Sequence, residues 1–598
     1  MMKLSQSRFI CIWVFILGYV LLAAIPAASI TAPMQEDVLL KALKDELDRS
    51  VEKLQLKDME KPYYIEYAVE DIEMFNIKSV FGAVVNSNRR QSRMLRVEVR
   101  VGSYNLDNTG FVGQSYMYSM MRPPRQLVLE DDYIALRHDL WLVTDRAYKQ
   151  ALEQFSQKKS FIKTKVQTEE IPDFSREEVT KAIDPRKPLK FDQSKWQEVV
   201  CNLSGIFKEF PAIYDSSVSL NVKIAHKYFV NSEGTESLQP ATIVSLYARA
   251  STQAPDGMRL KHFVPFFGID LEQFPSEKEM AVKVQKMAEE LTSLTKAPVL
   301  EKYIGPVLVM GQAASELFAQ VLTPQLSGER PLLMEQQRMT AMDTQSKLVS
   351  RLNRRVLPSF INVVDDPTQK TSNKRQLIGS YKVDDQGVLA RSVKLIERGF
   401  LRTLLMSRRP RKEILHSNGH GRYAQVGSPS ANIGNLFVQT TEGKSFADLK
   451  QELIELCRKQ DLSYGLIIRK LDNPSITSVD PSMMRREIRR DSVTAPILVY
   501  KVSVEDGQEE LVRGVVVEEV SVRTLKEIMA AGSEYHVNNR LTTGGGIIGF
   551  AFPFSLNFAA GIPTTVVAPS VLFEELELKK PSGPQQKPAF LKHPFFKK

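Results

Sequence analysis

The sequence is poor in the side chains that most often hold metals or form cross-links. Its 598 residues include three cysteines and seven histidines. None of the histidines is followed by a glutamate, so neither H-E-x-x-H nor H-E-x-x-x-H occurs. A C-x-x-C pair, a G-x-S-x-G elbow and a P-loop are also missing. The sequence therefore has no recognisable zinc helix, disulfide framework, serine-hydrolase elbow or phosphate-binding loop.

The few cysteines do not suggest a disulfide. Cys11 lies in the apolar N-terminal segment, whereas Cys201 and Cys457 fall within amphipathic helical patterns. A cysteine in such a pattern usually packs as a small hydrophobic residue. We therefore expect Cys201 and Cys457 to be buried free thiols.

No region of the chain gathers charge of one sign. The 80 lysines and arginines and 70 aspartates and glutamates give a formal charge of +10, spread along the whole length. A protein that binds nucleic acid usually concentrates its basic residues in a patch or stripe. We therefore expect no nucleic-acid partner.

Residues 1–32 have the layout of an export signal. Lys3 and Arg8 precede an almost wholly apolar run from Phe9 to Ala24, and small residues follow it. We expect an exported protein, periplasmic or extracellular, from which this signal peptide is removed. An uncleaved leader that anchors the chain is the alternative. No later segment is long and apolar enough to span a bilayer, so we expect no membrane contact beyond the leader.

The first half predicts a mixed α+β domain over residues 33–296. Leucines at three- and four-residue spacing indicate a helix from Leu39 to Leu54, and alternating apolar and charged residues indicate a strand from Leu95 to Val101. In a helix at 131–155 we expect Trp141, Tyr148 and Leu152 on the buried side. Similar patterns predict strands at 63–72, 79–86, 217–230 and 242–250, and helices around Trp196 and Cys201 and at 276–294.

The second half predicts a sheet-dominated, barrel-like domain over residues 297–578. Ala297 and Pro298 interrupt the preceding helical pattern, and an apolar strand follows at 306–310. The segments 384–387 and 506–507 are typical of hairpin turns. The chain is therefore expected to be an α+β protein of two domains.

Two helices and a disordered tail complete the predictions for the second half. Ser445 and Asp448 can form a cap for a helix that ends near Lys459, and a second helix is expected over 522–530. The tail at 579–598 combines prolines and lysines without any period, which is typical of disorder.

A series of segments in the second half has a recognisable order and spacing. They are Leu357–Pro367, Gly379–Gly387, Leu395–Gly399, Leu404–Arg409 and Ser417–Arg422. This series resembles the C-terminal domain of the TldD/PmbA metallopeptidase family. The resemblance implies a TldD/PmbA-like fold with a peptide cleft, and His416, His420 and Arg422 are candidate residues of that cleft.

Active members of that family carry H-E-x-x-x-H on a helix that opens the C-terminal half, and a later cysteine is a further zinc ligand. The resemblance aligns the motif with Ser315–Gln320, where Ser315 and Gln320 replace the histidines and Glu316 keeps the position of the general base. A serine hydroxyl and a glutamine carbonyl are poor zinc ligands beside a neutral imidazole. The cysteine is missing too, because Cys457 lies upstream of its expected position and no cysteine follows. The resemblance therefore implies a degenerate metal site, and we expect no cofactor.

The loss of the metal changes what is expected of Glu316. Without zinc there is no polarised water for it to deprotonate. We therefore expect Glu316 to be inactive and to be an exposed carboxylate on its helix.

The resemblance also implies a role. PmbA-type subunits of the family lack the zinc motif and pair with a catalytic TldD-type subunit. We therefore expect an inactive subunit of a peptide-degrading complex, a homo- or hetero-oligomer with a TldD-like relative and a peptide as its substrate. Two alternatives stay open: an active metallopeptidase with zinc on an unrecognised set such as His416, His420 and a carboxylate, and a stand-alone envelope protein that binds peptides.

Overall fold

A computed structural model of the chain describes residues 37–113, 125–164, 170–188, 191–335, 346–424, 427–477, 493–542 and 561–581. The chain divides into two compact units, Met1–Asp37 and Val38–Lys598, and every element named below belongs to the second. The predicted leader at 1–32 and residues 582–598 of the predicted tail lie outside the described residues.

The first sheet is built from long, mainly antiparallel strands. Its order is β4-β2-β1-β6-β7-β5, and β8 also pairs with β7. Leu95, Val99 and Val101 of its second strand are buried, whereas Arg89 and Gln91 on the same face are exposed, so this face of the strand changes from core to surface along its length. The strands are β1 (Pro62–Val80), β2 (Ala83–Val101), β4 (Arg125–Gln126), β5 (Lys181–Ile183), β6 (Asp215–Asn231), β7 (Glu236–Gln253) and β8 (Arg259–Gly268).

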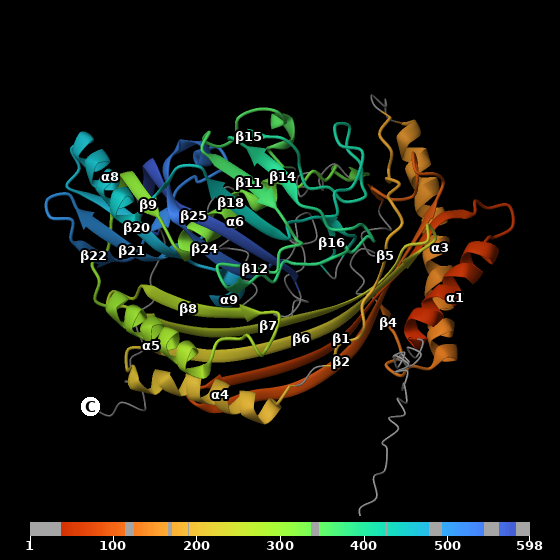
Figure 1. Ribbon diagram of the computed structural model, residues 1–598, viewed down its shortest axis with the longest axis horizontal. Coiled ribbons are helices and arrows are strands. Elements are labelled where there is room, and N and C mark those ends of the chain that lie inside the picture. Colours follow the sequence, from red (N-terminus) through yellow and green to blue (C-terminus); the bar gives the residue numbers. More distant parts are fainter. Residues whose placement is uncertain are drawn as a thin grey trace, which may run out of the picture. The chain divides into compact units, whose positions relative to one another are not determined.

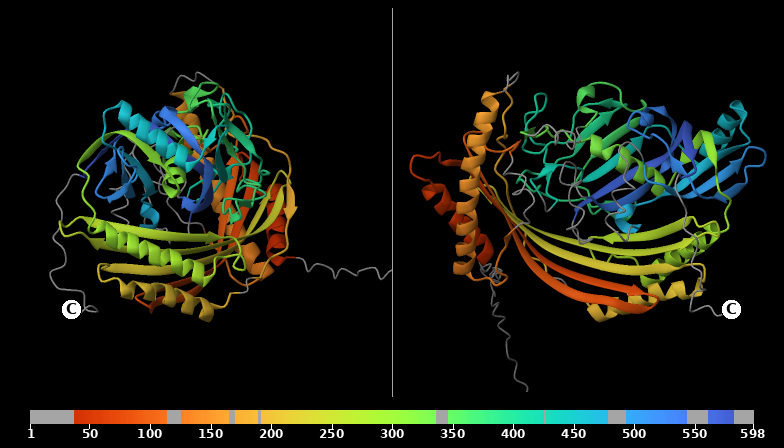
Figure 2. Two further views of the ribbon diagram at one scale, coloured as in Figure 1. Left: turned by 60° about the vertical axis from the view of Figure 1, so that its left-hand side comes forward. Right: turned by 180° about the vertical axis from the view of Figure 1, so that it is seen from behind.

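Four helices pack on this sheet. Figure 1 shows α4 (Gln193–Gly205) and α5 (Glu277–Leu294) along one face of the long strands, where α4 contacts β1, β2 and β6 and α5 contacts β7 and β8. Figure 2 shows α3 (Tyr133–Lys163) across one end of the strands, and it packs on β2 and on α1 (Val38–Lys53). The side chains of Asp132, Asp192 and Ser276 cap α3, α4 and α5 at their first turns.

The second sheet is formed entirely by strands of the second half. Its main path is β15-β14-β11-β18-β25-β9-β20-β21-β22, and β19, β23 and β24 join it beside this path. The long strand β25 (Ile562–Lys579) pairs with four others, parallel to β18 and antiparallel to β9, β23 and β24. The remaining strands are β9 (Lys302–Val309), β11 (Ile361–Asp365), β14 (Val393–Glu397), β15 (Phe400–Leu401), β18 (Asn435–Thr440), β19 (Gly443–Lys444), β20 (Tyr464–Leu471), β21 (Pro496–Ser503), β22 (Glu509–Val512), β23 (Val516–Val517) and β24 (Ile528–Thr542).

Two helices pack on the second sheet, and short elements connect its strands. The helix α6 (Gln312–Val321) contacts β20, β24 and β25, and α8 (Phe446–Lys459) contacts β9, β20, β24 and β25. The short elements are β3 (Phe111–Val112) paired with β10 (Leu333–Met334), β12 (Thr371–Ser372) with β13 (Arg375–Gln376), β16 (Gly421–Arg422) with β17 (Ser430–Ala431), α9 (Pro474–Thr477), and the 3-10 turns Ile206–Glu209, Thr323–Gln325, Val349–Arg351 and Thr524–Glu527.

The hydrophobic cores link the two halves of the chain. The largest surrounds α6 and the second sheet, with Phe318, Val307 and Val566 among its fully buried members. The core beneath α4 and α5 belongs to the first sheet, yet Ile497 and Leu498 of β21 are part of it. The second half is therefore packed on the first by apolar contact as well as by polar contact.

The structure confirms the predicted α+β class and most of the predicted elements. The cap of α8 is a capping box in which the Ser445 side chain accepts a hydrogen bond from the Asp448 backbone and the Asp448 side chain accepts one from the Ser445 backbone. Cys457 is buried and Cys201 is half-buried, and both are free thiols. None of the described helices is long and apolar enough to cross a membrane. The domain boundary near Lys296 lies between α5 and β9 and stays a prediction.

Three predictions about the elements were wrong. Residues 79–86 are not a separate strand: they comprise the end of β1, a turn at Phe81 and Gly82 with φ of 46° and 76°, and the start of β2. Residues 522–530 contain a 3-10 turn and the start of β24 instead of a helix. Ile528 and Ala530 pair with β25, and their spacing follows the two-residue period of a strand. Trp141 is 46% exposed, since the buried side of α3 is formed by Leu136, Leu140, Thr144, Tyr148 and Ala151.

Candidate functional site

The helix α6 carries the three residues that the resemblance assigned to the metal site. The helix begins at Gln312, and its N-cap residue is Gly311, whose φ of 60° is a conformation that glycine adopts without strain. Because α6 packs between β20, β24 and β25, its polar residues are enclosed: Ser315 and Glu316 are both 0% exposed. The prediction that Glu316 is an exposed carboxylate was therefore wrong.

The carboxylate of Glu316 accepts hydrogen bonds from side chains of α6 and β24. Nη1 of Arg540 lies 3.0 Å from Oε1 and forms an ion pair with it. Nδ2 of Asn538 donates to Oε2 at 2.8 Å, and Nε2 of Gln320 donates to Oε1 at 2.9 Å. Asn538 and Arg540 are two positions apart on β24, so both side chains point to the same side of the strand. A buried carboxylate is tolerated when it is paired and hydrogen-bonded in this way.

Gln320 uses both ends of its amide group. Its Oε1 accepts a hydrogen bond from the backbone N–H of Thr494 at 2.8 Å, which fixes the orientation of the amide. Its Nε2 also donates to Oγ1 of Thr494 at 2.8 Å, and that hydroxyl donates to the Asp472 carbonyl at 2.6 Å. The Gln320 side chain therefore joins α6 to the segments around Asp472 and Thr494.

Ser315 makes a local contact. Its hydroxyl donates to the Gln312 carbonyl at 3.2 Å, one helical turn earlier, which is a common arrangement for a buried serine in a helix. The Gln312 side chain also belongs to the site, because its Oε1 accepts from the Leu471 backbone N–H at 2.9 Å.

These residues do not fit a zinc ion. The Ser315 hydroxyl and the Gln320 carbonyl oxygen are both used by hydrogen bonds, and the guanidinium of Arg540 already compensates the charge of Glu316. A bound cation would have to displace another cation from the same carboxylate. Among the described residues, no group of three or more histidine, cysteine, aspartate or glutamate side chains could hold a metal ion.

His416 and His420 lie in a loop, as the sequence predicted, but they do not share a site. His420 is fully buried, with Nε2 3.0 Å from Oδ1 of Asp365 and Nδ1 3.0 Å from the Asn418 carbonyl. The side chain of His416 is 75% exposed, with Nδ1 3.7 Å from Oε1 of Glu177. The structure therefore does not bring the two histidines together with a carboxylate as one ligand set.

Arg422 belongs to a buried network that includes Asp384 and Asp385. Its guanidinium lies 4.2 Å above the centre of the Tyr381 ring, and its Nε is 3.9 Å from Oδ2 of Asp385. The ammonium of Lys227 lies 2.8 Å from Oδ1 of Asp385 and, with Arg422, it lowers the pKa of Asp385 although burial raises it. Burial raises the pKa of Asp384 to about 6, despite hydrogen bonds that its carboxylate accepts from backbone N–H groups.

Sequence reasoning missed Arg540, Asn538 and Thr494. The polar residues at 536, 538 and 540 alternate along β24, which is a strand pattern. Nothing in the spacing indicates that this strand lies against α6, more than 200 residues earlier in the chain. Their role follows from the tertiary contacts.

Residues 301–580 match the family model of the PmbA/TldA metallopeptidase C-terminal domain. A metalloprotease of Methanocaldococcus jannaschii is 28% identical over 142 residues, which are 23% of this chain and 30% of the relative. A metalloprotease of Archaeoglobus fulgidus is 32% identical over 111 residues, which are 19% of this chain and 24% of the relative. The chain thus spans 24% to 30% of the length of these curated relatives.

Solved structures resemble the chain over nearly all of its length. A Thermotoga maritima protein described as a candidate modulator of a DNA gyrase has a TM-score of 0.57 at 16% identity, covering 90% of this chain and 99% of the other. TldE from Thermococcus kodakarensis has a TM-score of 0.53 at 13% identity, with the same coverage. At such low identity these likenesses show a common fold and carry no activity with them.

Proposed function

We propose that this chain, whose residues 301–580 match the family model of the PmbA/TldA metallopeptidase C-terminal domain, is an exported, non-catalytic relative of that family that forms a complex with a zinc-bearing relative and helps to bind peptides. The proposal has three parts, which are the loss of the metal, the partner and the export. Each part has its own support.

The single observation that carries the first part is the ion pair between Glu316 and Arg540. Glu316 is the residue that the family motif assigns to the general base, and a general base needs a metal-bound water in this mechanism. Here the carboxylate accepts hydrogen bonds from Arg540, Asn538 and Gln320 and is fully buried. A carboxylate held in this way has the properties of a structural group rather than of a base.

The other two parts are supported by the sequence. The resemblance to PmbA-type subunits, which lack the zinc motif and pair with a TldD-type subunit, supports a partner with an intact motif. The apolar run after Lys3 and Arg8 supports export. Peptide binding is supported by the names of the curated relatives, both of which are called metalloproteases.

Zinc titration by calorimetry of the wild type and three variants tests the first part. We expect no zinc binding by the wild type and weak binding by Ser315→His with Gln320→His, because Arg540 still compensates Glu316 and a third strong ligand is missing. Adding Arg540→Ala to the two histidines should tighten zinc binding at least about tenfold, since removal of the cation frees the carboxylate. The matched control adds Arg402→Ala instead, an arginine whose side chain is 46% exposed and remote from Glu316 in its contacts.

Stoichiometric zinc in the wild type that disappears on His420→Ala would contradict the proposal and favour the active metallopeptidase. Recovery of the tagged chain from its native envelope with a relative that carries H-E-x-x-x-H would support the partner. Recovery without any such relative would favour a stand-alone peptide-binding protein.

A further inference from the structure

The two faces of the first sheet differ in character at the middle of its long strands. One face carries apolar side chains, among them Phe75, Ile77 and Leu220, which belong to the core beneath α4 and α5. Because successive residues of a strand point to opposite faces, their neighbours in the sequence lie on the other face, and many of these are polar. We call six of them the polar face: Asn88 and Arg90 of β2, Asn76 and Lys78 of β1, and Asn221 and Lys223 of β6.

Three asparagines form a row across three strands of the polar face. Asn76 is directly opposite Asn88 on one side and Asn221 on the other. Residues opposite each other on neighbouring strands have Cβ atoms about 5 Å apart, and here Nδ2 of Asn76 donates to Oδ1 of Asn88 at 3.2 Å. Within the described residues, the side chain of Asn221 makes no hydrogen bond. Asparagine is depleted in strands, so the strand propensity of these residues does not account for the row.

Basic side chains lie on both sides of the asparagine row. Arg90 and Lys223 are both opposite Met74, which is two residues before Asn76 on β1. Lys78 is two residues after Asn76 on the same strand. Rows two residues apart are separated by about 6.7 Å, so the two basic rows are about 13 Å apart, with the asparagines midway between them.

Few carboxylates accompany these cations. Glu70, on the same side of β1, lies 3.4 Å from Nζ of Lys223 and 3.4 Å from Nζ of Lys227, so one carboxylate is shared by two ammonium groups. Neither Lys78 nor Arg90 forms an ion pair within 4.0 Å in the part of the chain that the structure describes. The two residues of β2 on the polar face are exposed, and the other four are half-buried. The polar face is therefore accessible and attracts an anionic ligand.

The polar face is on the side of the sheet that carries the second half of the chain. Lys227 and Arg96 follow Lys223 and Arg90 on the same sides of β6 and β2. Nζ of Lys227 lies 2.8 Å from Oδ1 of Asp385, and Nη2 of Arg96 donates to the Asp385 carbonyl at 2.8 Å. Figure 2 shows α4 and α5 on the opposite side of the sheet. A ligand on the polar face therefore binds on the side where the two halves of the chain meet.

We propose that the polar face binds an extended peptide with acidic side chains four positions apart. Alternate side chains of an extended chain project to one side and repeat every 6.7 Å or about that, which matches the spacing of the rows. Two carboxylates four positions apart can therefore reach both basic rows and form charge-assisted hydrogen bonds. The asparagine amides, which both donate and accept, are then placed to bind the peptide backbone between them. The choice of a peptide rests on the proposed function, whereas the preference for acidic residues rests on the rows.

The composition of the polar face favours a peptide over a nucleic acid. Proteins that bind single-stranded nucleic acids combine basic side chains with aromatic ones on which the bases stack. None of the six residues is aromatic. Tyr247, which shares a row with Lys78 through Ser219, is 8% exposed. The face therefore lacks an exposed aromatic platform in this row.

Fluorescence anisotropy of labelled peptides with the full-length protein at low ionic strength tests this proposal. Short alanine-based peptides with blocked ends serve as probes. The first has two glutamates four positions apart, the second has two adjacent glutamates, and the third has two glutamines four positions apart. The first peptide should bind at least about tenfold more tightly than the other two. The second has the same charge, but adjacent side chains of an extended chain point to opposite sides.

Lys78→Gln with Arg90→Gln removes one cation from each basic row. This variant should bind the first peptide about tenfold more weakly than the wild type and the glutamine peptide equally well. The matched control is Lys195→Gln with Lys278→Gln, which removes the same number of charges from exposed positions on α4 and α5. It should bind all three peptides like the wild type. Circular dichroism checks that both variants are folded.

Equal affinity of the wild type for the two acidic peptides, or unchanged affinity in the Lys78 and Arg90 variant, would overturn the proposal. Tighter binding of oligothymidylate than of the first peptide would assign the polar face to a nucleic acid and overturn it as well. Equal affinity for all three peptides would overturn the polar face but agree with the proposed peptide binding, whereas no binding of any peptide would contradict both. The zinc titration and the recovery of a partner do not depend on any of these outcomes.

Discussion

At the scale of single residues, the ion pair between Glu316 and Arg540 involves a buried carboxylate. Removing one partner of such a pair lowers the free energy of unfolding by more than the intact pair contributes, because the other charge is left buried and unpaired. Arg540→Ala should lower the free energy of unfolding by about 3 kcal/mol, because the buried carboxylate keeps its amide donors but loses its counter-charge. Chemical denaturation monitored by circular dichroism measures this change.

The paired substitution separates a lost counter-charge from lost packing. Glu316→Gln combined with Arg540→Met should recover much of the stability, since no charge is then buried alone. Ser315→Ala should change stability by less than about 1 kcal/mol, because its hydroxyl makes one local bond to its own helix. If the double variant is no more stable than Arg540→Ala, the lost counter-charge is not the cause of the destabilisation by Arg540→Ala.

Asp384 makes the free energy of unfolding depend on pH. Burial raises its pKa from 3.8 to about 6, so the folded protein binds this proton more tightly than the unfolded chain does. The stability that this group contributes is therefore complete below about pH 3.8 and is lost as the pH rises through about 6. Between pH 5 and pH 7.5 the contribution falls by about 1 kcal/mol.

Asp384→Asn tests this dependence, since an amide does not titrate. The difference in unfolding free energy between wild type and variant should shift by about 1 kcal/mol in favour of the wild type at pH 5 relative to pH 7.5. Glu397→Gln, at an exposed ion pair, serves as the control for a general effect of removing one carboxylate. A constant difference across this range would rule out Asp384 as the titrating group.

At the scale of elements, the capping box of α5 is a local contribution that can be measured within one helix. Ser276 caps the first turn with Glu279, whereas Ser293 lies near the C-terminal end with its hydroxyl on the Glu289 carbonyl. Ser276→Ala should lower the free energy of unfolding by about 1 kcal/mol, and Ser293→Ala by less than about 0.5 kcal/mol. Equal effects of the two substitutions in thermal unfolding would contradict the role of the cap.

The elements that could be predicted are those whose signals are local. The cap at Ser445 and the helical spacing at 276–294 are complete within a few turns, and α8 and α5 follow them. The turn at Phe81–Gly82 and the strand at Ile528 could not be predicted, because their sequences also suit the wrong element and pairing with distant strands decides between them.

The candidate site also combines features that local sequence signals predict with features that depend on contacts between distant segments. The helix that carries Ser315, Glu316 and Gln320 was predicted, but the burial of Glu316 depends on Asn538 and Arg540 of a strand far away in the chain. The sequence pattern within α6 does not indicate the contact between Glu316 and β24. The helix could therefore be predicted from the sequence, whereas the burial and ion pairing of Glu316 could not.

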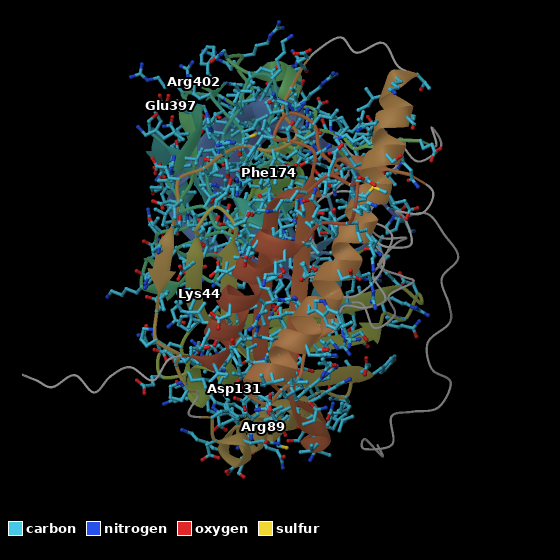
Figure 3. All side chains as sticks on the ribbon, turned by 90° about the vertical axis from the view of Figure 1, so that its right-hand side faces the viewer. Lys44, Arg89, Asp131, Phe174, Glu397 and Arg402 are labelled. Carbon is cyan, nitrogen blue, oxygen red and sulfur yellow. The ribbon has the colours of Figure 1, made fainter. Side chains whose placement is uncertain are left out.

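At the scale of the whole molecule, Arg408 ties the two halves of the chain together. It is 1% exposed, and it forms two hydrogen bonds of 2.7 and 2.8 Å with Glu233 in the turn between β6 and β7. Its guanidinium lies 3.9 Å from the centre of the Phe174 ring, and that of Arg100 lies 3.6 Å from the same ring. Phe174, labelled in Figure 3, is thus in contact with two arginines.

Arg408→Ala should therefore lower the free energy of unfolding by about 3–5 kcal/mol and increase hydrogen exchange in the segments around Ser175 and Glu233. The control is Arg402→Ala. In the wild type, Nε of Arg402 lies 3.5 Å from Glu397 and the two side chains are 46% and 44% exposed. Both residues are labelled in Figure 3. An exposed pair contributes at most about 1 kcal/mol. Similar effects of the two substitutions would mean that Arg408 does not join the halves.

Peptide hydrolysis by the purified, full-length chain most directly tests the claim that the metal centre has been replaced by an internal ion pair. The protein would be incubated with unfolded peptides, free of any relative, with added zinc and with a chelator. The predicted result is no hydrolysis above the protein-free background in either condition. Hydrolysis that zinc stimulates and the chelator abolishes would contradict the claim.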